Sequence, residues 1–295
     1  MNEPGTHFHK TRIAPTPSGY LHLGNIYSFA LTAALAQKYN TQILLRIDDL
    51  DRERVQKIYV QDIFDTLHFL NIPWNEGPQH YNDYEQQYSQ LYRLPLYRSA
   101  LQQLKQSGAL FACNCSRAQV LQRSPSGIYP GTCLQKNLPF DADDVCWRLD
   151  TTYNGILNIK DLSGNSTPAA LPPSMQYFVV RKKDGFPAYQ LASVIDDLHF
   201  GVDMIVRGAD LWDSTLAQLY LAQKLGLHAF SNIAFHHHQL MMDRGEKKLS
   251  KSDGATSVQY LRRQGKTAAD IYRRVSEMAG FKTPADSWKN FMPIL

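Results

Sequence analysis

A run of turn-forming and hydrogen-bonding residues near the start of the chain has the make-up of a phosphate-binding turn. Prolines at 15 and 17 and a glycine at 19 mark the turn, and His22, Gly24 and Asn25 follow where an alanine-rich helix should begin. Backbone N–H groups at a helix start attract phosphate. His22 and Asn25 can donate further hydrogen bonds, and Gly24 lets a ligand approach the backbone. The alternative is an ordinary helix start with a surface histidine.

A second candidate lies late in the chain, where Lys248, Ser250 and Lys251 stand in a basic run. Ammonium groups at such a place can stabilise the charge that builds on a phosphate leaving group in the transition state. Taken alone, the same residues also fit a solvated basic turn.

Three of the four cysteines, Cys113, Cys115 and Cys133, fall within twenty-one residues. Zinc takes four tetrahedral ligands, and thiolates are common among them. However, one intervening residue between the first two is tighter than the usual two, and no histidine lies between His80 and His199. The spacing leaves two interpretations open, a zinc site and three buried cysteines in a reducing compartment.

These residues need a scaffold, and the pattern predicts an α/β one. We expect a strand at 11–14, a turn, a helix at 25–39 and a strand at 42–47, which is the βαβ order of a parallel sheet. Helices are also predicted at 60–70, 83–107 and 214–225, and a strand at 203–206. The turn-rich stretch 113–186 reads as an inserted subdomain of short strands and loops, and two helical stretches end the chain.

The bulk composition excludes some classes of protein. No stretch of eighteen apolar residues is present, so we expect no membrane span. The first residues lack the apolar core of a signal peptide, so we expect a cytoplasmic protein. The net charge of +4 is too small to indicate nucleic-acid binding by itself, although basic residues gather late in the chain.

The two candidate phosphate segments resemble the two signatures of class I aminoacyl-tRNA synthetases. The run from Arg12 to Asn25 is similar to the HIGH signature in its glutamyl and glutaminyl form, and the KLSKS run at 248–252 is similar to KMSKS. Asn25 replaces the second histidine and Thr16 the usual first serine. The resemblance implies catalytic roles for His22, Lys248 and Lys251. It also implies a site for ATP with Mg2+ at His22, Gly24, Asn25, Lys248, Ser250 and Lys251.

The same family implies a glutamate pocket. Its first signature begins with a substrate-binding arginine, which matches Arg12 with Ala14 and Thr16 beside it. Asp48 stands where the family has a glutamate that holds the substrate ammonium, one methylene shorter. The run 188–197 resembles a strand and turn of the family, and the run 206–211 resembles its Arg-Gly-Xaa-Asp-Leu segment. These runs add Tyr189 and Arg207, and the two arginines favour glutamate over glutamine because a guanidinium pairs with a carboxylate.

A small branch of the family, the glutamyl-Q tRNA(Asp) synthetases, carries a similar cysteine pattern. Its members have Cys-Xaa-Cys-Ser/Thr-Arg-Ala and then Gly-Ile-Tyr-Xaa-Gly-Xaa-Cys, and this chain matches both at 113–118 and 127–133. The resemblance implies one structural Zn2+ bound by Cys113, Cys115, Tyr129 and Cys133. Cys146 matches nothing and is interpreted as a packing residue.

The resemblance also sets the expected organisation and activity. We expect a Rossmann-like catalytic domain of class I type at 10–112 and 187–243, the zinc-containing insertion at 113–186, and the KLSKS segment with a short helical region at 244–295. About forty residues follow KLSKS, too few for an anticodon-binding domain. We therefore expect a monomer that activates L-glutamate with ATP and transfers it to queuosine in the anticodon of tRNA(Asp). The alternatives are a truncated synthetase charging a tRNA 3′ end and a non-catalytic RNA-binding module.

Overall fold

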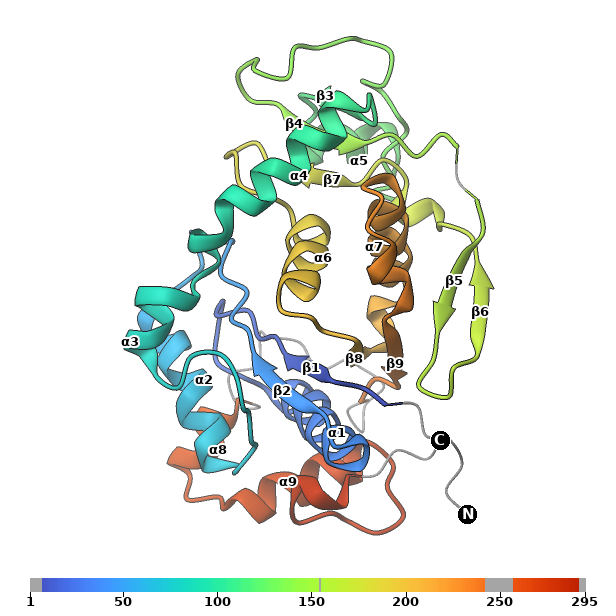
Figure 1. Ribbon diagram of the computed structural model, residues 1–295. Helices are drawn as coiled ribbons and strands as arrows, with labels where there is room; N and C mark the ends of the chain where they lie inside the picture. Colours follow the sequence, from blue (N-terminus) through green and yellow to red (C-terminus); the bar gives the residue numbers. More distant parts are fainter. Residues whose placement is uncertain (1–6, 154, 242–256, 292–295) are drawn as a thin grey trace. The chain divides into compact units, whose positions relative to one another are not determined.

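The computed structural model describes residues 7–153, 155–241 and 257–291. The chain divides into two compact units (Figure 1). Unit 1 comprises Met1–Tyr92, Val202–Asp210 and Phe235–Leu295, and unit 2 comprises Arg93–Gly201 and Leu211–Ala234. No helix within the described ranges is long and apolar enough to cross a membrane.

Unit 1 is built on a βαβ core. β1 (Lys10–Ile13) pairs in parallel with β2 (Gln42–Leu45), and the connection between them is α1 (Leu23–Tyr39). α1 is buried on nearly every side, because it contacts β1 on one side and α9 (Ala268–Met278) on the other (Figure 1). β8 (Met204–Gly208) contacts both β1 and α1. The predicted βαβ order and parallel pairing are confirmed.

The remaining elements of unit 1 surround this core. They are α2 (Lys57–Phe69), α3 (Tyr81–Asp83), the π-helical turn Tyr84–Tyr88, the 3-10 turn that starts at Gln90, most of β9 (Ala234–His238), α8 (Val258–Arg263), and the 3-10 turns Ala209–Leu211 and Trp288–Asn290. α8 and α9 begin at Ser257 and Thr267, whose side chains cap the first turns.

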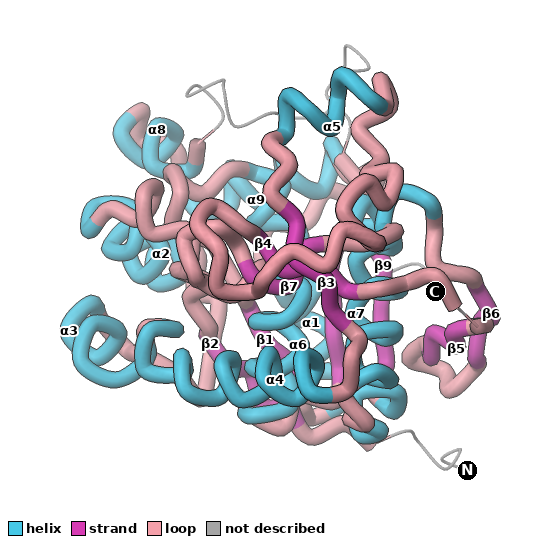
Figure 2. Tube along the Cα trace, turned by 90° about the horizontal axis from the view of Figure 1, so that it is seen from above, coloured by secondary structure: helices cyan, strands magenta, loops and turns pink. Residues whose placement is uncertain are grey.

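Unit 2 combines short strands with three longer helices. β3 (Leu110–Cys113), β4 (Cys146–Leu149) and β7 (Val179–Arg181) form an antiparallel sheet, and β5 (Leu157–Lys160) pairs antiparallel with β6 (Ser166–Ala169). The helices are α4 (Leu94–Gln106), the short α5 (Arg117–Arg123), α6 (Tyr189–His199) and α7 (Trp212–Lys224), with 3-10 turns at Pro173–Met175 and His228–Asn232. α6 contacts both α4 and α7, and α4 and α6 lie side by side in Figure 2.

Two local predictions are wrong. The run 188–197 is not a strand and turn but the greater part of helix α6, because Leu191, Val194 and Asp197 recur at helical spacing on its buried face. The stretch 83–107 is not one helix. It is a π-helical turn, a 3-10 turn and α4, interrupted at Ser89, whose backbone is extended.

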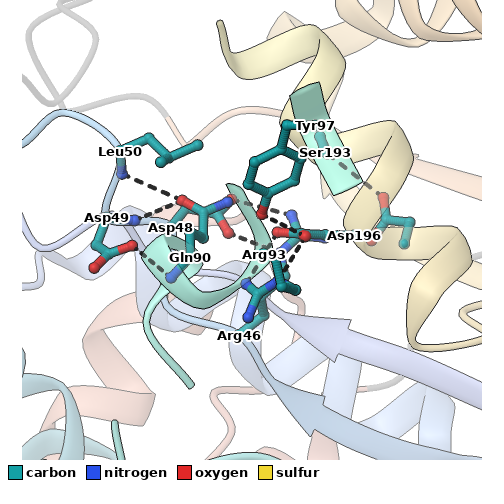
Figure 3. A network of polar contacts seen from close by, with 10 residues as sticks. Arg46, Asp48, Asp49, Leu50, Gln90, Arg93, Tyr97, Ser193 and Asp196 are labelled. Atoms are coloured by element: carbon teal, nitrogen blue, oxygen red, sulfur yellow. Dashed lines mark hydrogen bonds and ion pairs between the residues drawn. The ribbon is translucent and has the colours of Figure 1, made fainter. Parts of the chain in front are cut away.

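The interruption has a tertiary cause, the buried carboxylate of Asp49. This carboxylate accepts hydrogen bonds from the Tyr84 hydroxyl (2.7 Å), the Ser89 hydroxyl (2.6 Å) and the Gln90 amide (2.9 Å), and it pairs with Arg52 at 2.6 Å. The Asp49 amide in turn donates to the Gln90 side-chain oxygen at 2.8 Å, as Figure 3 shows. Asp49 therefore ties the segment after β2 to the segment 84–90.

Replacing Asp49 by alanine should destabilise unit 1 by roughly 3–5 kcal/mol, because it leaves several buried donors without their acceptor. Urea denaturation followed by circular dichroism measures this loss. The matched control is Asp51→Ala two residues on, since Asp51 is exposed and its ion pair with Arg54 is long at 3.7 Å. That change should cost less than about 1 kcal/mol. Equal losses in the two variants would contradict the anchoring role of Asp49.

Candidate active site

The histidine of the first signature caps the helix that follows it. His22 is the N-cap of α1, with extended backbone dihedrals, and its Nδ1 accepts a hydrogen bond from the Gly24 amide at 3.1 Å. The Asn25 side-chain oxygen accepts from the His22 amide at 3.1 Å, which completes a capping box. Because Nδ1 acts as acceptor, the neutral ring carries its hydrogen on Nε2 and is a donor there. The predicted His22, Gly24 and Asn25 are thus brought together at one helix start.

Gly24 leaves room for the ring of the capping histidine. A Cβ added at Gly24 would lie 3.0 Å from His22 Cε1 and 3.1 Å from its Nδ1. An alanine at this position would therefore displace the imidazole ring. The absence of a side chain at Gly24 therefore leaves space for the His22 ring, besides the space expected for a ligand.

The chain after the KLSKS segment returns to this turn. Ser257 forms an antiparallel bridge with His22, and the Val258 amide donates to the Leu21 carbonyl at 2.8 Å. The predicted Lys248, Ser250 and Lys251 lie outside the described residues. Ser257 was not predicted as a site residue, because its role depends on a backbone contact more than two hundred residues away in sequence.

Two buried arginines stand on β1 and β8, which contact each other. Arg12 of β1 is 6% exposed, and its Nη1 donates to the carbonyl of Val206 at 3.2 Å. Arg207, the next residue in β8, is 3% exposed, and its guanidinium lies 4.9 Å from the centre of the Phe235 ring. The predicted Arg12 and Arg207 are therefore both buried in unit 1, and Arg12 contacts the backbone of the residue before Arg207. Two buried cations of this kind suit an anionic ligand.

The histidines of β9 add no charge near Arg207. Burial, then the proximity of Arg207, lowers the pKa of His237 to about 3. Burial also lowers the pKa values of His236 and His238. These three rings are therefore neutral at pH 7, and they leave the arginines as the local source of positive charge.

Asp48 lies where β2 leaves the sheet, in contact with the signature turn. The Arg46 and Asp48 amides donate to the Ile13 and Pro15 carbonyls, both at 2.9 Å, so the two segments run together past the strand ends. Arg46 binds the Asp48 carboxylate through two hydrogen bonds of 2.7 and 3.0 Å (Figure 3). Asp48 therefore enters the site as part of an ion pair. Ala14 is half-buried here, and Thr16 is exposed.

Tyr189 belongs to unit 2, where it is the first residue of α6 and 44% exposed. A few residues further along α6, the buried Asp196 accepts hydrogen bonds from Arg93 Nε at 2.7 Å and from the Tyr97 hydroxyl at 2.6 Å (Figure 3). This pairing attaches α6 to the start of α4. It fixes the helix on which Tyr189 stands.

The cysteine cluster of unit 2 has the geometry of a metal site. The sulfurs of Cys113, Cys115 and Cys133 lie within 4.8 Å of one another, and those of Cys115 and Cys133 are 3.6 Å apart. Tetrahedral ligation at Zn–S distances of about 2.3 Å places sulfurs about 3.8 Å apart. The Tyr129 hydroxyl lies 3.2 Å from the Cys113 sulfur and accepts from the Cys133 amide at 2.8 Å. The three thiols can hold a metal ion, and the Tyr129 hydroxyl lies beside them.

The surroundings of the cluster shift the pKa values of its thiols in opposite directions, since burial raises the pKa of Cys115 to about 11. Hydrogen bonding from Cys146 lowers the pKa of Cys113 to about 4, although burial opposes the shift. Cys146 stands opposite Cys113 in the β3–β4 register, and its sulfur donates to the Cys113 carbonyl at 3.3 Å. The fourth cysteine is thus buried beside the cluster, outside the group of three sulfurs.

Comparison with known proteins places this geometry in a family. Residues 9–126 and 135–286 match the model of the catalytic domain of class I tRNA synthetases (E and Q). A glutamyl-Q tRNA(Asp) synthetase from Rhodobacter capsulatus is 32% identical over 286 residues, covering 90% of this chain and 99% of that protein. Glutamate–tRNA ligase 2 from Syntrophus aciditrophicus is 31% identical and matches 87% of this chain, which spans about half (54%) of that protein.

A solved structure shares the fold. Glutamate–tRNA synthetase from Elizabethkingia anophelis superposes with a TM-score of 0.68 at 22% identity, covering 84% of this chain and 53% of the other. The family match extends over nearly the whole chain and includes the capped turn, both arginines and the cysteines except Cys133. This chain therefore belongs to the class I tRNA synthetases of the glutamate and glutamine group, a family of ligases.

Proposed function

We propose that this chain activates L-glutamate with ATP and transfers the glutamyl group to the queuosine base of tRNA(Asp). The observation that carries the proposal is the burial of two guanidinium groups in unit 1, that of Arg12 on the strand that leads into the His22 turn and that of Arg207 on β8, whose backbone Arg12 contacts at Val206. Ligands of parallel α/β sheets bind at the carboxyl ends of the strands, where β1 gives way to this turn. Relatives named glutamyl-Q tRNA(Asp) synthetase, matched over most of their length, support the choice of acceptor.

In this proposal the start of α1 receives the phosphates of ATP. The ATP contacts are His22, Gly24, Asn25, Lys248, Ser250 and Lys251, with His22, Lys248 and Lys251 in catalytic roles. Mg2+ bound with ATP would neutralise phosphate charge.

Glutamate binds through both of its carboxyl groups and its ammonium group. The proposed contacts are Arg12, Ala14, Thr16, Asp48, Tyr189 and Arg207. The arginines take the side-chain carboxylate through paired charge-assisted hydrogen bonds, which a neutral amide cannot match. Asp48 faces the ammonium, and its pairing with Arg46 fixes the direction of its carboxylate.

The chemistry proceeds in two steps. An oxygen of the glutamate α-carboxylate attacks the α-phosphorus of ATP, a P–O bond forms, and the bond to the β-phosphate breaks with release of pyrophosphate. A hydroxyl of the queuosine cyclopentenediol then attacks the activated carbonyl, loses its proton and displaces AMP. Positioning and charge stabilisation account for the first step, and no covalent enzyme intermediate is needed.

Glutamate-dependent ATP–pyrophosphate exchange without RNA tests the first step. The wild-type chain should support exchange with glutamate and not with glutamine, and Arg207→Gln should lower kcat/KM for glutamate by about 100-fold, through loss of a charge-assisted pair worth roughly 2–3 kcal/mol. Arg274→Gln, on an exposed position of α9, is the control and should leave the rate unchanged. Equal rates with glutamine would contradict the assignment of the arginines.

The acceptor is tested by locating the transferred group. With radiolabelled glutamate and queuosine-containing tRNA(Asp), nuclease digestion should release the label on the anticodon nucleotide. A tRNA(Asp) transcript without queuosine is the control and should stay unlabelled. Label on the 3′-terminal adenosine would instead support a truncated synthetase that charges a tRNA end.

The metal of the cysteine cluster is proposed to be one structural Zn2+, bound by Cys113, Cys115, Tyr129 and Cys133. Inductively coupled plasma mass spectrometry of the purified protein should then find about one zinc per chain. Cys115→Ser should remove this zinc. Cys146→Ser is the matched control, because a serine hydroxyl can keep the hydrogen bond to the Cys113 carbonyl. Zinc lost equally from both variants would contradict this ligand set.

A further inference from the structure

Leu21, the residue before the catalytic histidine candidate, is held by both of its backbone polar groups. Its carbonyl accepts from the Val258 amide at 2.8 Å, and its amide donates to the Asp62 carboxylate (Oδ2) at 3.3 Å. These two contacts come from different elements, the start of α8 and the middle of α2. The position of the His22 turn therefore depends on both helices.

Asp62 lies on the buried face of α2 and is 3% exposed. Its second oxygen, Oδ1, accepts from Arg262 Nη2 of α8 at 3.1 Å. Arg262 also lies over the Phe69 ring of α2, 5.8 Å from its centre. A buried carboxylate is costly unless it is paired in this way. One carboxylate oxygen of Asp62 therefore binds the His22 turn, and the other binds α8.

The contacts close a ring of three segments. α2 contacts the turn through Asp62 and through the edge-on packing of Tyr59 against Tyr20, with ring centres 5.1 Å apart. The turn contacts α8 through the bridge between His22 and Ser257, and α8 returns to α2 through Arg262. A shift of any one segment would therefore displace the other two.

We propose that Asp62 is a positioning residue that holds the His22 turn and α8 in one fixed arrangement through Leu21 and Arg262. Asp62 itself contacts no substrate, and its effect on activity rests on the proposed ATP chemistry at His22. An error of about 1 Å in the place of a catalytic group can cost on the order of 100-fold in rate. A carboxylate that fixes the position of the His22 turn without touching substrate should therefore affect kcat more than the binding of glutamate.

A conservative substitution at Asp62 should leave the core folded, because the site borders solvent. An open cleft of about 590 Å3 is lined by Tyr20, Lys57, Asp62, Asp65, Arg262 and Arg263. Water in this cleft can solvate Arg262, whose side chain is 20% exposed. Asp62→Asn has nearly the same shape and removes a charge whose burial is itself unfavourable. Its melting temperature should stay within about 3 °C of wild type.

The experiment compares wild type with Asp62→Asn, Arg262→Gln and the double variant, and takes Asp65→Asn as control. Asp65 stands on α2 one turn from Asp62, but it is exposed, and its side-chain hydrogen bond within the described part of the chain is a local one with Gln61. In glutamate-dependent pyrophosphate exchange, Asp62→Asn and Arg262→Gln should each lower kcat by about 10-fold or more, with KM for glutamate within twofold. The double variant should be no slower than the worse single variant, because both disrupt one unit. Asp65→Asn should match wild type.

Hydrogen–deuterium exchange gives a readout independent of activity. The amides of 21–25 and 257–262 should exchange at least 10-fold faster in Asp62→Asn than in wild type, and at the wild-type rate in Asp65→Asn. Unchanged protection with unchanged kcat would overturn the proposal, and so would a kcat loss matched by an equal loss of folded protein. If the wild-type chain showed no pyrophosphate exchange with glutamate, the proposed function would fail, and amide protection alone would then decide the role of Asp62.

Discussion

The start of α1 is the constraint on which the rest of this site depends. The first backbone N–H groups of a helix have no partner within it, and here the side chains of His22 and Asn25 form the cap. A phosphate at this helix start would meet the same donors and the same two side chains. If the proposed function holds, the cap and the ligand site are one structure, and residues that fix the cap also fix the place where phosphate binds. Gly24 belongs to this set because a side chain there would meet the imidazole ring.

The charges around the proposed glutamate pocket form a consistent arrangement. Arg12 and Arg207 are buried cations, the neighbouring β9 histidines are neutral, and Asp48 is already paired with Arg46. The pocket therefore offers strong positive charge to a side-chain carboxylate and a partly neutralised carboxylate to the substrate ammonium. The shorter reach of Asp48 is compatible with this arrangement because Arg46 fixes its direction through two hydrogen bonds.

Local patterns predicted much of the fold. The alanine-rich run after Asn25 and the apolar run at 42–47 predicted α1 and β2. Each run can be recognised from its own residues, without knowledge of its partners in the fold. The error at 188–197 came from following a motif of the family when the helical spacing of Leu191 and Val194 was visible. The broken helix at 83–107 was different. Its interruption depends on Asp49, some forty residues earlier, and no local pattern reports such a contact.

The same distinction holds for the site. The grouping of His22, Gly24 and Asn25 was predictable because they lie within one turn, and Arg12 and Arg207 could be proposed because a family motif marks each of them. Ser257 and Asp62 were not predictable, since each acts through the backbone of a residue distant in sequence. In the sequence, Asp62 is one more acid in an amphipathic helix, and only its burial distinguishes it.

A crystal structure with 5′-O-[N-(L-glutamyl)sulfamoyl]adenosine, a stable analogue of glutamyl-adenylate, tests the central claim most directly. The account predicts the sulfamoyl group, which stands for the α-phosphate, at the first turn of α1 within hydrogen-bond distance of His22 or a backbone amide. It also predicts the glutamyl side-chain carboxylate on Arg12 or Arg207. An analogue bound away from the start of α1, or one whose carboxylate contacts neither arginine, would contradict it.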